Sequence, residues 1–136
     1  MRLAVPNETA PGELRVALTP DTVGRLVKGG HDVRIQAGAG ERAGFPDSAY
    51  VASGATVVER GALYGDVALV CRVQPPSPAE ADEIPEGAAL LALMNPSRNA
   101  PLLAQLAKRN VTALALELVP RITRAQSMDV LSSQST

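Results

Sequence analysis

The feature that most constrains the fold is the alternation of short β-type runs with helical segments along the chain. The runs with strand character are residues 2–5, 31–36, 56–59, 67–73, 88–94 and 111–116. Between them lie segments with helical spacing or helix-capping residues, at 20–28, 47–53, 78–83 and 102–109. Strands separated by helices form βαβ units, which join parallel strands. The pattern therefore predicts a three-layer α/β domain with a mostly parallel sheet of about six strands.

Local signals support this assignment. Thr19-Pro20-Asp21 supplies a helix N-cap, a proline at the first helical position and an early acid, and Gly29-Gly30 ends that helix. Residues 67–71 and 88–94 are continuous apolar runs, which are typical of strands covered by helices on both faces. The expected fold is therefore Rossmann-like or flavodoxin-like.

Composition excludes several classes of function. The formal net charge is −1 and aromatic residues make up 2% of the chain, without tryptophan, so we expect no nucleic acid as partner. No run approaches the ~20 apolar residues that cross a bilayer, and the N-terminus lacks a signal peptide. We therefore expect no direct membrane insertion and a reducing, aqueous compartment. One histidine and one cysteine do not make a zinc site, so no metal is expected, and Cys71 in its apolar run is predicted to be buried and inert.

Polar and proline-containing loops follow four of the expected strands. They span residues 6–15, 74–76, 95–99 and 120–123. In parallel sheets, ligands bind beyond the carboxyl ends of the strands, so the sequence predicts a binding site among these loops.

A glycine-containing segment, residues 38–44, imitates a dinucleotide-binding fingerprint. It follows an expected strand, and Glu59 lies about twenty residues further on. The third glycine comes one residue late, however, and Phe45-Pro46 interrupts the helix that should follow. We predict a glycine turn and no phosphate loop.

The segment 120–135 is the most informative, and its residues alone leave two interpretations open. It carries two guanidinium groups, an amide, a carboxylate and several hydroxyls, which can hold a carboxamide and ribose hydroxyls through hydrogen bonds. Alternatively, Thr123 and Gln126 form a capping box at the start of a helix, and Asp129 is a solvated acid on that helix.

The same segment resembles a loop of the NAD(H)-binding component of proton-translocating NAD(P) transhydrogenases, with the pattern Pro-Arg-Ile-Ser/Thr-Arg-Ala-Gln-Ser-Met-Asp-x-Leu-Ser-Ser. Other matching stretches are Val5-Pro6-x-Glu8, residues 12–17 with Thr19-Pro20, Gly38-Ala39-Gly40 with Tyr50, residues 53–55, and Arg72-Val73-Gln74-Pro75. The resemblance spans essentially the whole chain. It implies that residues 1–136 form one domain, the N-terminal half of the NAD(H)-binding component.

The resemblance also implies a function. Members transfer hydride from NADH, bound between two Rossmann-like domains, to NADP+ held by a partner component, and they couple this transfer to proton translocation. The implied partners are a second copy in a homodimer and the NADP(H)-binding and membrane-spanning components. The implied location is the cytoplasm, peripheral to the inner membrane. No side chain acts as acid or base, because the cofactor carries the chemistry. The residues implied to bind cofactor are Arg121, Ile122, Thr123, Arg124, Gln126, Asp129 and Ser132.

Two other functions remain open. Alanine dehydrogenases share this N-terminal architecture, but they use a lysine and a histidine to bind and protonate a keto acid, and Gln74 and Asn95 stand at those positions here. The second alternative is a truncated, non-catalytic assembly module or fragment. The glycine-rich dinucleotide-binding domain is absent from these residues, so we expect the chain alone to be inactive and to bind NAD weakly.

Three further side chains have open roles. Arg15 follows a Pro/Gly loop and either grips an acidic ligand or forms an ion pair with Glu8 or Glu13. Arg72 replaces a lysine of the family, which makes ligand contact by this residue doubtful. His31 is predicted to lie at the surface, at the start of a strand.

Overall fold

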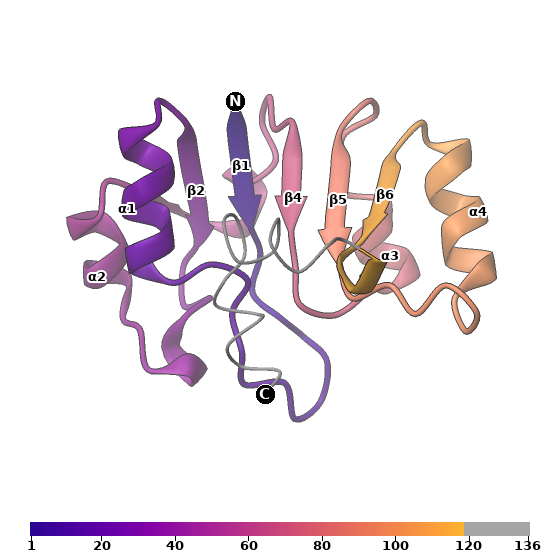
Figure 1. Cartoon of the computed structure of the whole chain (residues 1–136), viewed down its shortest axis with the longest axis horizontal. Coiled ribbons are helices and arrows are strands. Elements are labelled where there is room, and N and C mark those ends of the chain that lie inside the picture. Colours follow the sequence, from indigo (N-terminus) through magenta and orange to yellow (C-terminus); the bar gives the residue numbers. More distant parts are fainter. Residues whose placement is uncertain (119–136) are drawn as a thin grey trace.

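The computed structural model describes residues 1–118, and all six expected strands lie where the sequence predicts them (Figure 1). The strands and α-helices, in chain order, are β1 (Arg2–Val5), α1 (Pro20–Lys28), β2 (Asp32–Gln36), α2 (Asp47–Ala52), β3 (Thr56–Val58), β4 (Leu69–Cys71), α3 (Pro78–Ala81), β5 (Ala89–Ala92), α4 (Ala100–Lys108) and β6 (Thr112–Ala115). Short 3-10 helices are η1 (Glu41–Ala43), η2 (Arg60–Ala62) and η3 (Leu116–Leu118).

The strands of residues 1–118 form one six-stranded sheet in the order β3-β2-β1-β4-β5-β6, and every neighbouring pair is parallel. The first of these strands in the chain is therefore central, with β2 on one side and β4 on the other. This arrangement confirms the predicted Rossmann-like α/β class.

Helices cover the two faces of the sheet in separate halves. On one face, Leu3 and Ile35 of the sheet pack with Val23 of α1 and Tyr50 of α2. On the other face, a second cluster joins strand residues such as Leu90 to α3 and α4. Figure 1 shows α1 and α2 on the β2 side of the molecule and α3 and α4 on the β5 and β6 side.

The helix ends follow the local signals in the sequence. Thr19 caps α1 by accepting a hydrogen bond from the backbone N–H of Thr22. Ser77 and Glu80 form a reciprocal capping box at the start of α3. This second cap fixes the chain direction soon after β4, and it places Glu80 near the carboxyl edge of the sheet.

Several elements are shorter than predicted. Of the strand predicted at 67–73, only Leu69–Cys71 is a strand, although Ala68 and Arg72 still donate backbone hydrogen bonds to Arg2 and Leu91. The strand predicted at 88–94 spans Ala89–Ala92, and the helix expected at 78–83 spans Pro78–Ala81.

The glycine segment is a turn, as predicted. The backbone N–H of Gly38 donates to Asp47, and the turn leads into the three-residue η1 rather than into a long helix. A Cβ at Gly40 would lie 2.6 Å from Cε2 of Tyr50 and 2.8 Å from the carbonyl oxygen of Phe45. Glycine is therefore required here by the close packing of the Tyr50 ring.

Within residues 1–118, no helix is long and apolar enough to cross a membrane. Cys71 is buried, and burial raises the pKa of its thiol to about 12. His31 lies directly before β2, where Nδ1 is 3.4 Å from the terminal amino group in an exposed contact, in line with its predicted surface position. These two residues are thus placed as the sequence predicts.

Candidate functional site

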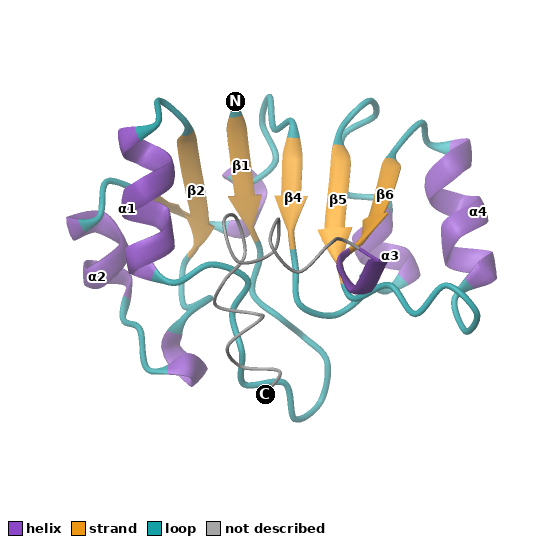
Figure 2. Cartoon of the chain, viewed as in Figure 1, coloured by secondary structure: helices purple, strands orange, loops and turns teal. Residues whose placement is uncertain are grey.

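The sheet formed by residues 1–118 has a topological switch point between β1 and β4. The chain leaves β1 toward β2 on one side and leaves β4 toward β5 on the other. In sheets of this kind, the loops diverge at the switch point and open a crevice beyond the carboxyl ends of the strands. The loops 6–19, 72–77 and 93–99 lie at this edge, toward which the arrowheads point in Figure 2. The predicted loop 120–123 lies outside the described residues.

A buried carboxylate joins the two sides of the switch point. Glu8, in the loop after β1, accepts hydrogen bonds from the backbone N–H groups of Val73 at 2.9 Å and Gln74 at 3.1 Å. Only 3% of Glu8 is exposed to solvent. Burial raises the pKa of Glu8, although the nearby guanidinium of Arg72 and the two backbone hydrogen bonds act to lower it. Glu8 therefore fastens the loop after β1 to the end of β4.

Arg72 is buried beside Glu8 and faces into the protein. Its Nε donates to the carbonyl oxygen of Gln74 at 3.1 Å, and its Nη2 lies 3.8 Å from Glu8 Oε1 and 3.5 Å from Glu80 Oε1. Its side chain is 2% exposed, so these contacts give the residue an internal role.

Glu80 ties α3 to the same group of charges. Its carboxylate accepts hydrogen bonds from Thr9 Oγ1 at 2.9 Å and from the backbone N–H of Ser77 at 2.8 Å. Burial tends to raise the pKa of Glu80, but these hydrogen bonds and the Arg72 charge outweigh it and lower the pKa. The loop after β1, the end of β4 and the start of α3 are thus held together by one set of polar contacts.

A second polar group lies at the same edge and settles the role left open for Arg15. Its guanidinium pairs with Glu13 through Nε to Oε2 at 3.0 Å and Nη2 to Oε1 at 2.9 Å. Gln74 Nε2 donates to Glu13 Oε1 at 2.8 Å. The hydrogen bonds from Arg15, opposed by partial burial, lower the pKa of Glu13 to about 2. The ion-pair interpretation with Glu13 is confirmed.

The loop after β5 is held by a residue that follows β6. Glu117 accepts the backbone N–H groups of Met94 and Asn95, each at 3.0 Å. Asn99 Nδ2 donates to the carbonyl oxygen of Met94 at 2.7 Å. Asn95 adopts a left-handed φ of 45°, which asparagine tolerates better than most residues. Sequence reasoning gave no role to Glu117 or Asn99, because their partners are identified only once the loop has folded.

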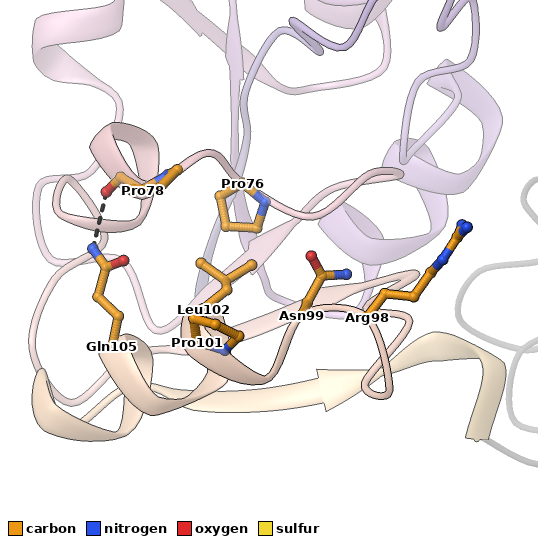
Figure 3. A pocket seen from close by; sticks show the side chains of 7 residues that line it. All are labelled: Pro76, Pro78, Arg98, Asn99, Pro101, Leu102 and Gln105. Atoms are coloured by element: carbon orange, nitrogen blue, oxygen red, sulfur yellow. Dashed lines mark hydrogen bonds between the residues drawn. The ribbon is translucent and has the colours of Figure 1, made fainter.

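Two adjoining hollows lie between these loops. The larger, of about 460 Å³, is lined by the loop after β1, residues 74–78, Glu80 and Asn99. The smaller, of about 270 Å³, lies against the start of α4 and shares Pro76, Pro78 and Asn99 with the first. Figure 3 shows its lining, with Gln105 bonded to the Pro78 carbonyl oxygen at 3.0 Å and Arg98 directed away from the other labelled side chains.

The chemistry of this edge favours hydrogen bonding to a neutral polar group. Near the switch point, the carboxylates of Glu8, Glu13 and Glu80 are engaged by the guanidiniums of Arg15 and Arg72 or by neighbouring backbone N–H groups. The amides and backbone groups beside these pairs can hydrogen-bond to a carboxamide or a ribose. Among residues 1–118, no three His, Cys, Asp or Glu side chains are grouped as metal ligands would be.

The cofactor-binding residues predicted from the sequence lie outside the described residues. These are Arg121, Ile122, Thr123, Arg124, Gln126, Asp129 and Ser132. They follow β6 and η3 in the chain, and the carboxyl end of β6 belongs to the same sheet edge as the two hollows. The proposed ligand contacts of these seven residues therefore remain predictions.

Known proteins resemble this chain along its whole length. Residues 4–136 match the sequence profile described as "Alanine dehydrogenase/PNT, N-terminal domain". The "NAD(P) transhydrogenase subunit alpha" of Cereibacter sphaeroides is 42% identical over 136 residues, which cover 99% of this chain and 26% of the relative. The "Alanine dehydrogenase" of Bacillus subtilis is 34% identical over 119 residues, which cover 88% of this chain and 32% of the relative.

A solved structure agrees with the sequence relatives. The transhydrogenase of Sinorhizobium meliloti superposes with a TM-score of 0.87 at 38% identity, over 99% of this chain and 40% of that chain. The chain therefore spans well under half the length of these relatives.

Proposed function

The chain belongs to the family of alanine dehydrogenase/PNT N-terminal domains, and from this membership we propose that it forms one wall of the NAD(H) cleft in an NAD(P) transhydrogenase α subunit. In the proposed enzyme, hydride passes from NADH to NADP+ bound by a partner component, coupled to proton translocation by a membrane-spanning component. The proposed assembly contains a homodimer of the NAD(H)-binding component on the cytoplasmic side of the inner membrane, attached only through its partners.

The switch-point chemistry is the observation that carries this proposal. The edge presents amides and backbone groups beside carboxylates and guanidiniums that are paired with one another. Such amides and backbone groups suit the carboxamide of the nicotinamide and the hydroxyls of its ribose. The nucleotide would then extend from this edge toward a separate binding site for its phosphates, as expected for a cleft between two domains.

The residues after Leu118 complete the proposed site. We assign Arg121 to the nicotinamide end, with Ile122, Thr123 and Arg124 beside it. Gln126 would reach toward the partner's NADP(H), and Asp129 and Ser132 would orient the nicotinamide and ribose. Their task is positioning, since the bound nicotinamides supply the hydride chemistry.

Alanine dehydrogenase activity has less support. That reaction needs a proton donor near the reacting carbon centre, which itself receives the hydride, and the two positions in question hold Gln74 and Asn95. Gln74 donates its amide to Glu13, and the Asn95 backbone is fixed by Glu117. Neither amide can act as a proton donor at neutral pH. Transfer between two nicotinamides needs no such donor, so this chain fits transhydrogenation better.

We also propose that residues 1–136 are one domain and that a second, glycine-rich domain supplies most of the dinucleotide contacts. The chain alone should then be inactive and bind NAD weakly. Melting the isolated chain with and without about 1 mM NAD tests this directly, because a ligand in roughly 100-fold excess over its Kd raises the Tm of the protein that binds it. No change in Tm is expected, and a clear rise would contradict the assignment of binding to the second domain.

The site assignment is tested in the assembled enzyme with Arg121→Ala. We expect hydride transfer to fall by roughly a hundredfold, because misplacement of the nicotinamide by about 1 Å has an effect of this size. Arg25→Ala is the matched control, since Arg25 lies on the exposed side of α1 in an i,i+4 pair with Asp21. Equal turnover in both variants would remove Arg121 from the site.

A further inference from the structure

A single carboxylate joins the end of β6 to the loop after the neighbouring strand. Among the strands of residues 1–118, β6 lies at the edge of the sheet and pairs with β5 alone. Glu117, in η3 directly after β6, accepts the backbone N–H of Met94 through Oε1 and that of Asn95 through Oε2, each at 3.0 Å. The carboxyl end of the edge strand is therefore fixed to the loop after β5.

The loop that Glu117 holds has a closed shape of its own. Asn95 has a left-handed φ, and its carbonyl oxygen accepts the backbone N–H groups of Arg98 at 2.9 Å and Asn99 at 3.2 Å. The side chain of Asn99 donates to the carbonyl oxygen of Met94, and the Met94 side chain is fully buried. Because the loop is closed by its own hydrogen bonds and anchored by a buried side chain, it gives Glu117 a firm point of attachment.

The arrangement needs a carboxylate. Each oxygen of Glu117 takes one backbone N–H, and hydrogen bonds from N–H groups to a charged acceptor are stronger than those between neutral groups. A glutamine side chain has the same length but only one acceptor oxygen, so its NH2 group would face the second N–H. Replacement of Glu117 by glutamine therefore changes this contact without changing the size of the side chain.

Glu117 also lies where the chain leaves the sheet toward the predicted ligand residues. Leu116 before it is 1% exposed and packs in the core, so these two neighbours together set the direction of the chain after β6. Arg121 is four residues further on, which is at most about 14 Å of extended chain. A change in the position of Glu117 is thus passed directly to the start of that segment.

We propose that Glu117 is a positioning residue for hydride transfer, which fixes the start of the segment with Arg121 against the loop after β5. The proposal rests on the proposed function, in which this segment holds the nicotinamide of NADH. In that reaction a C4–H bond of NADH breaks with both electrons and a C4–H bond forms on NADP+, which gives NAD+ and NADPH. The rate depends steeply on the placement of the two rings, and Glu117 acts on it only through the loop that it holds.

The competing explanation is that Glu117 only stabilises a surface loop. Glu117 is exposed, so water can take over the two N–H groups at little cost in stability. A purely structural role would then leave the transfer step unchanged in the enzyme that remains folded. A positioning role slows that step in folded enzyme, and the two explanations therefore predict different kinetics.

The test compares Glu117→Gln with the wild type in single turnovers of the assembled enzyme. The amplitude gives the amount of competent enzyme, and the rate constant gives the transfer step. We expect the rate constant to fall at least about tenfold at unchanged amplitude, because the nicotinamide is misplaced. The Kd of NADH should change less than about threefold, since an interaction that acts on the transfer step leaves ground-state binding nearly unchanged.

Asp47→Ala is the matched control. Asp47 also accepts a backbone N–H, that of Gly38 at 2.9 Å, but in the turn after β2 on the other side of the sheet order. This variant should lower the Tm and leave the rate constant unchanged. Hydrogen exchange of the Met94 and Asn95 amides gives a readout that does not depend on turnover, and it should be about tenfold faster in Glu117→Gln.

Four results would overturn the proposal. An unchanged rate constant in Glu117→Gln, in an enzyme that Arg121→Ala slows, would reject the role of Glu117 and keep the proposed function. A lower amplitude with an unchanged rate constant would assign Glu117 a structural role alone. Unchanged hydrogen exchange would show that Glu117 does not hold the loop. A wild-type enzyme without hydride transfer would reject the proposed function and this role with it.

Discussion

The carboxylate of Glu8, three residues after β1, accepts the backbone N–H of Val73, two residues after β4, with 2.9 Å between N and Oε2. A bond between residues 65 positions apart thus holds the two loops that border the switch point. The carboxylate is buried, and its second oxygen accepts the N–H of Gln74. Loss of the Glu8 side chain would therefore affect both walls of the crevice.

Glu8→Gln should lower the free energy of unfolding by about 2 kcal/mol, because the amide NH2 replaces one acceptor and leaves a buried N–H without a partner. Loss of the charge also leaves Arg72 with a weaker buried counter-ion. Urea denaturation measures the change. Glu59→Gln is the control, since Glu59 is exposed. Equal losses in the two variants would show that Glu8 does not fasten the loops.

Glu13 should make stability depend on pH in the acid range. Its pKa is about 2 in the folded protein, against an ordinary value of 4.5, chiefly because Arg15 donates hydrogen bonds to it. As the pH falls, Glu13 therefore binds a proton in the unfolded chain before it does so in the folded protein. The stabilisation by Glu13 is fully present above pH 4.5 and is lost as the pH falls toward 2.

The measurement is the difference in free energy of unfolding between the wild type and Glu13→Gln as a function of pH. Burial raises the pKa of Glu8, which acts in the opposite sense, but Glu8 is present in both proteins and largely cancels in the difference. We expect the wild type to be more stable at pH 7 and the two curves to converge by about pH 2. A difference that stays constant from pH 7 to pH 2 would contradict the ion pair.

Gly40→Ala should destabilise the turn after β2. The added methyl group would lie 2.6 Å from a ring carbon of Tyr50, whose hydroxyl is fixed by a 2.7 Å hydrogen bond to the carbonyl oxygen of Leu18. Overpacking of this kind costs about 2 kcal/mol. Gly61→Ala is the control, because a Cβ there meets nothing within 4 Å. Similar Tm values for both variants would show that the Tyr50 ring yields easily.

Cys71 should not react with a thiol reagent at pH 8 in the folded protein. Its side chain is buried and its pKa is raised to about 12, so almost no thiolate is present. About 6 M guanidinium chloride unfolds even very stable proteins, and one thiol per chain should react rapidly there. Rapid reaction without denaturant would show that the centre of the sheet opens readily.

The sequence predicted the elements whose signals are local. Thr19-Pro20 marked the start of α1 correctly, and the apolar runs marked β4 and β5 because a strand covered on both faces has few polar residues. The length of β4 was overestimated, since Val67 and Val73 are buried although they lie outside the strand Leu69–Cys71. Apolar character reports burial, and a buried residue need not belong to a strand.

The polar contacts of the site were harder to predict. Arg15 and Glu13 are two residues apart, so their pairing could be considered from the sequence, and the structure selected it. Arg72 with Glu8 and Glu80, and Glu117 with Met94, join residues that only the folded sheet brings together. No periodicity or spacing encodes such pairs, because each charge alone is typical of a solvated surface.

The central position of β1 in the sheet has a consequence for folding during synthesis on the ribosome. Of the six strands, β1 leaves the exit tunnel first, and β2 can pair with it after about thirty more residues have been made. Its other edge must wait for β4, which begins at residue 69. Until then one edge of β1 has no partner strand, and a nascent chain that stalls in this interval exposes an edge that can pair with another chain.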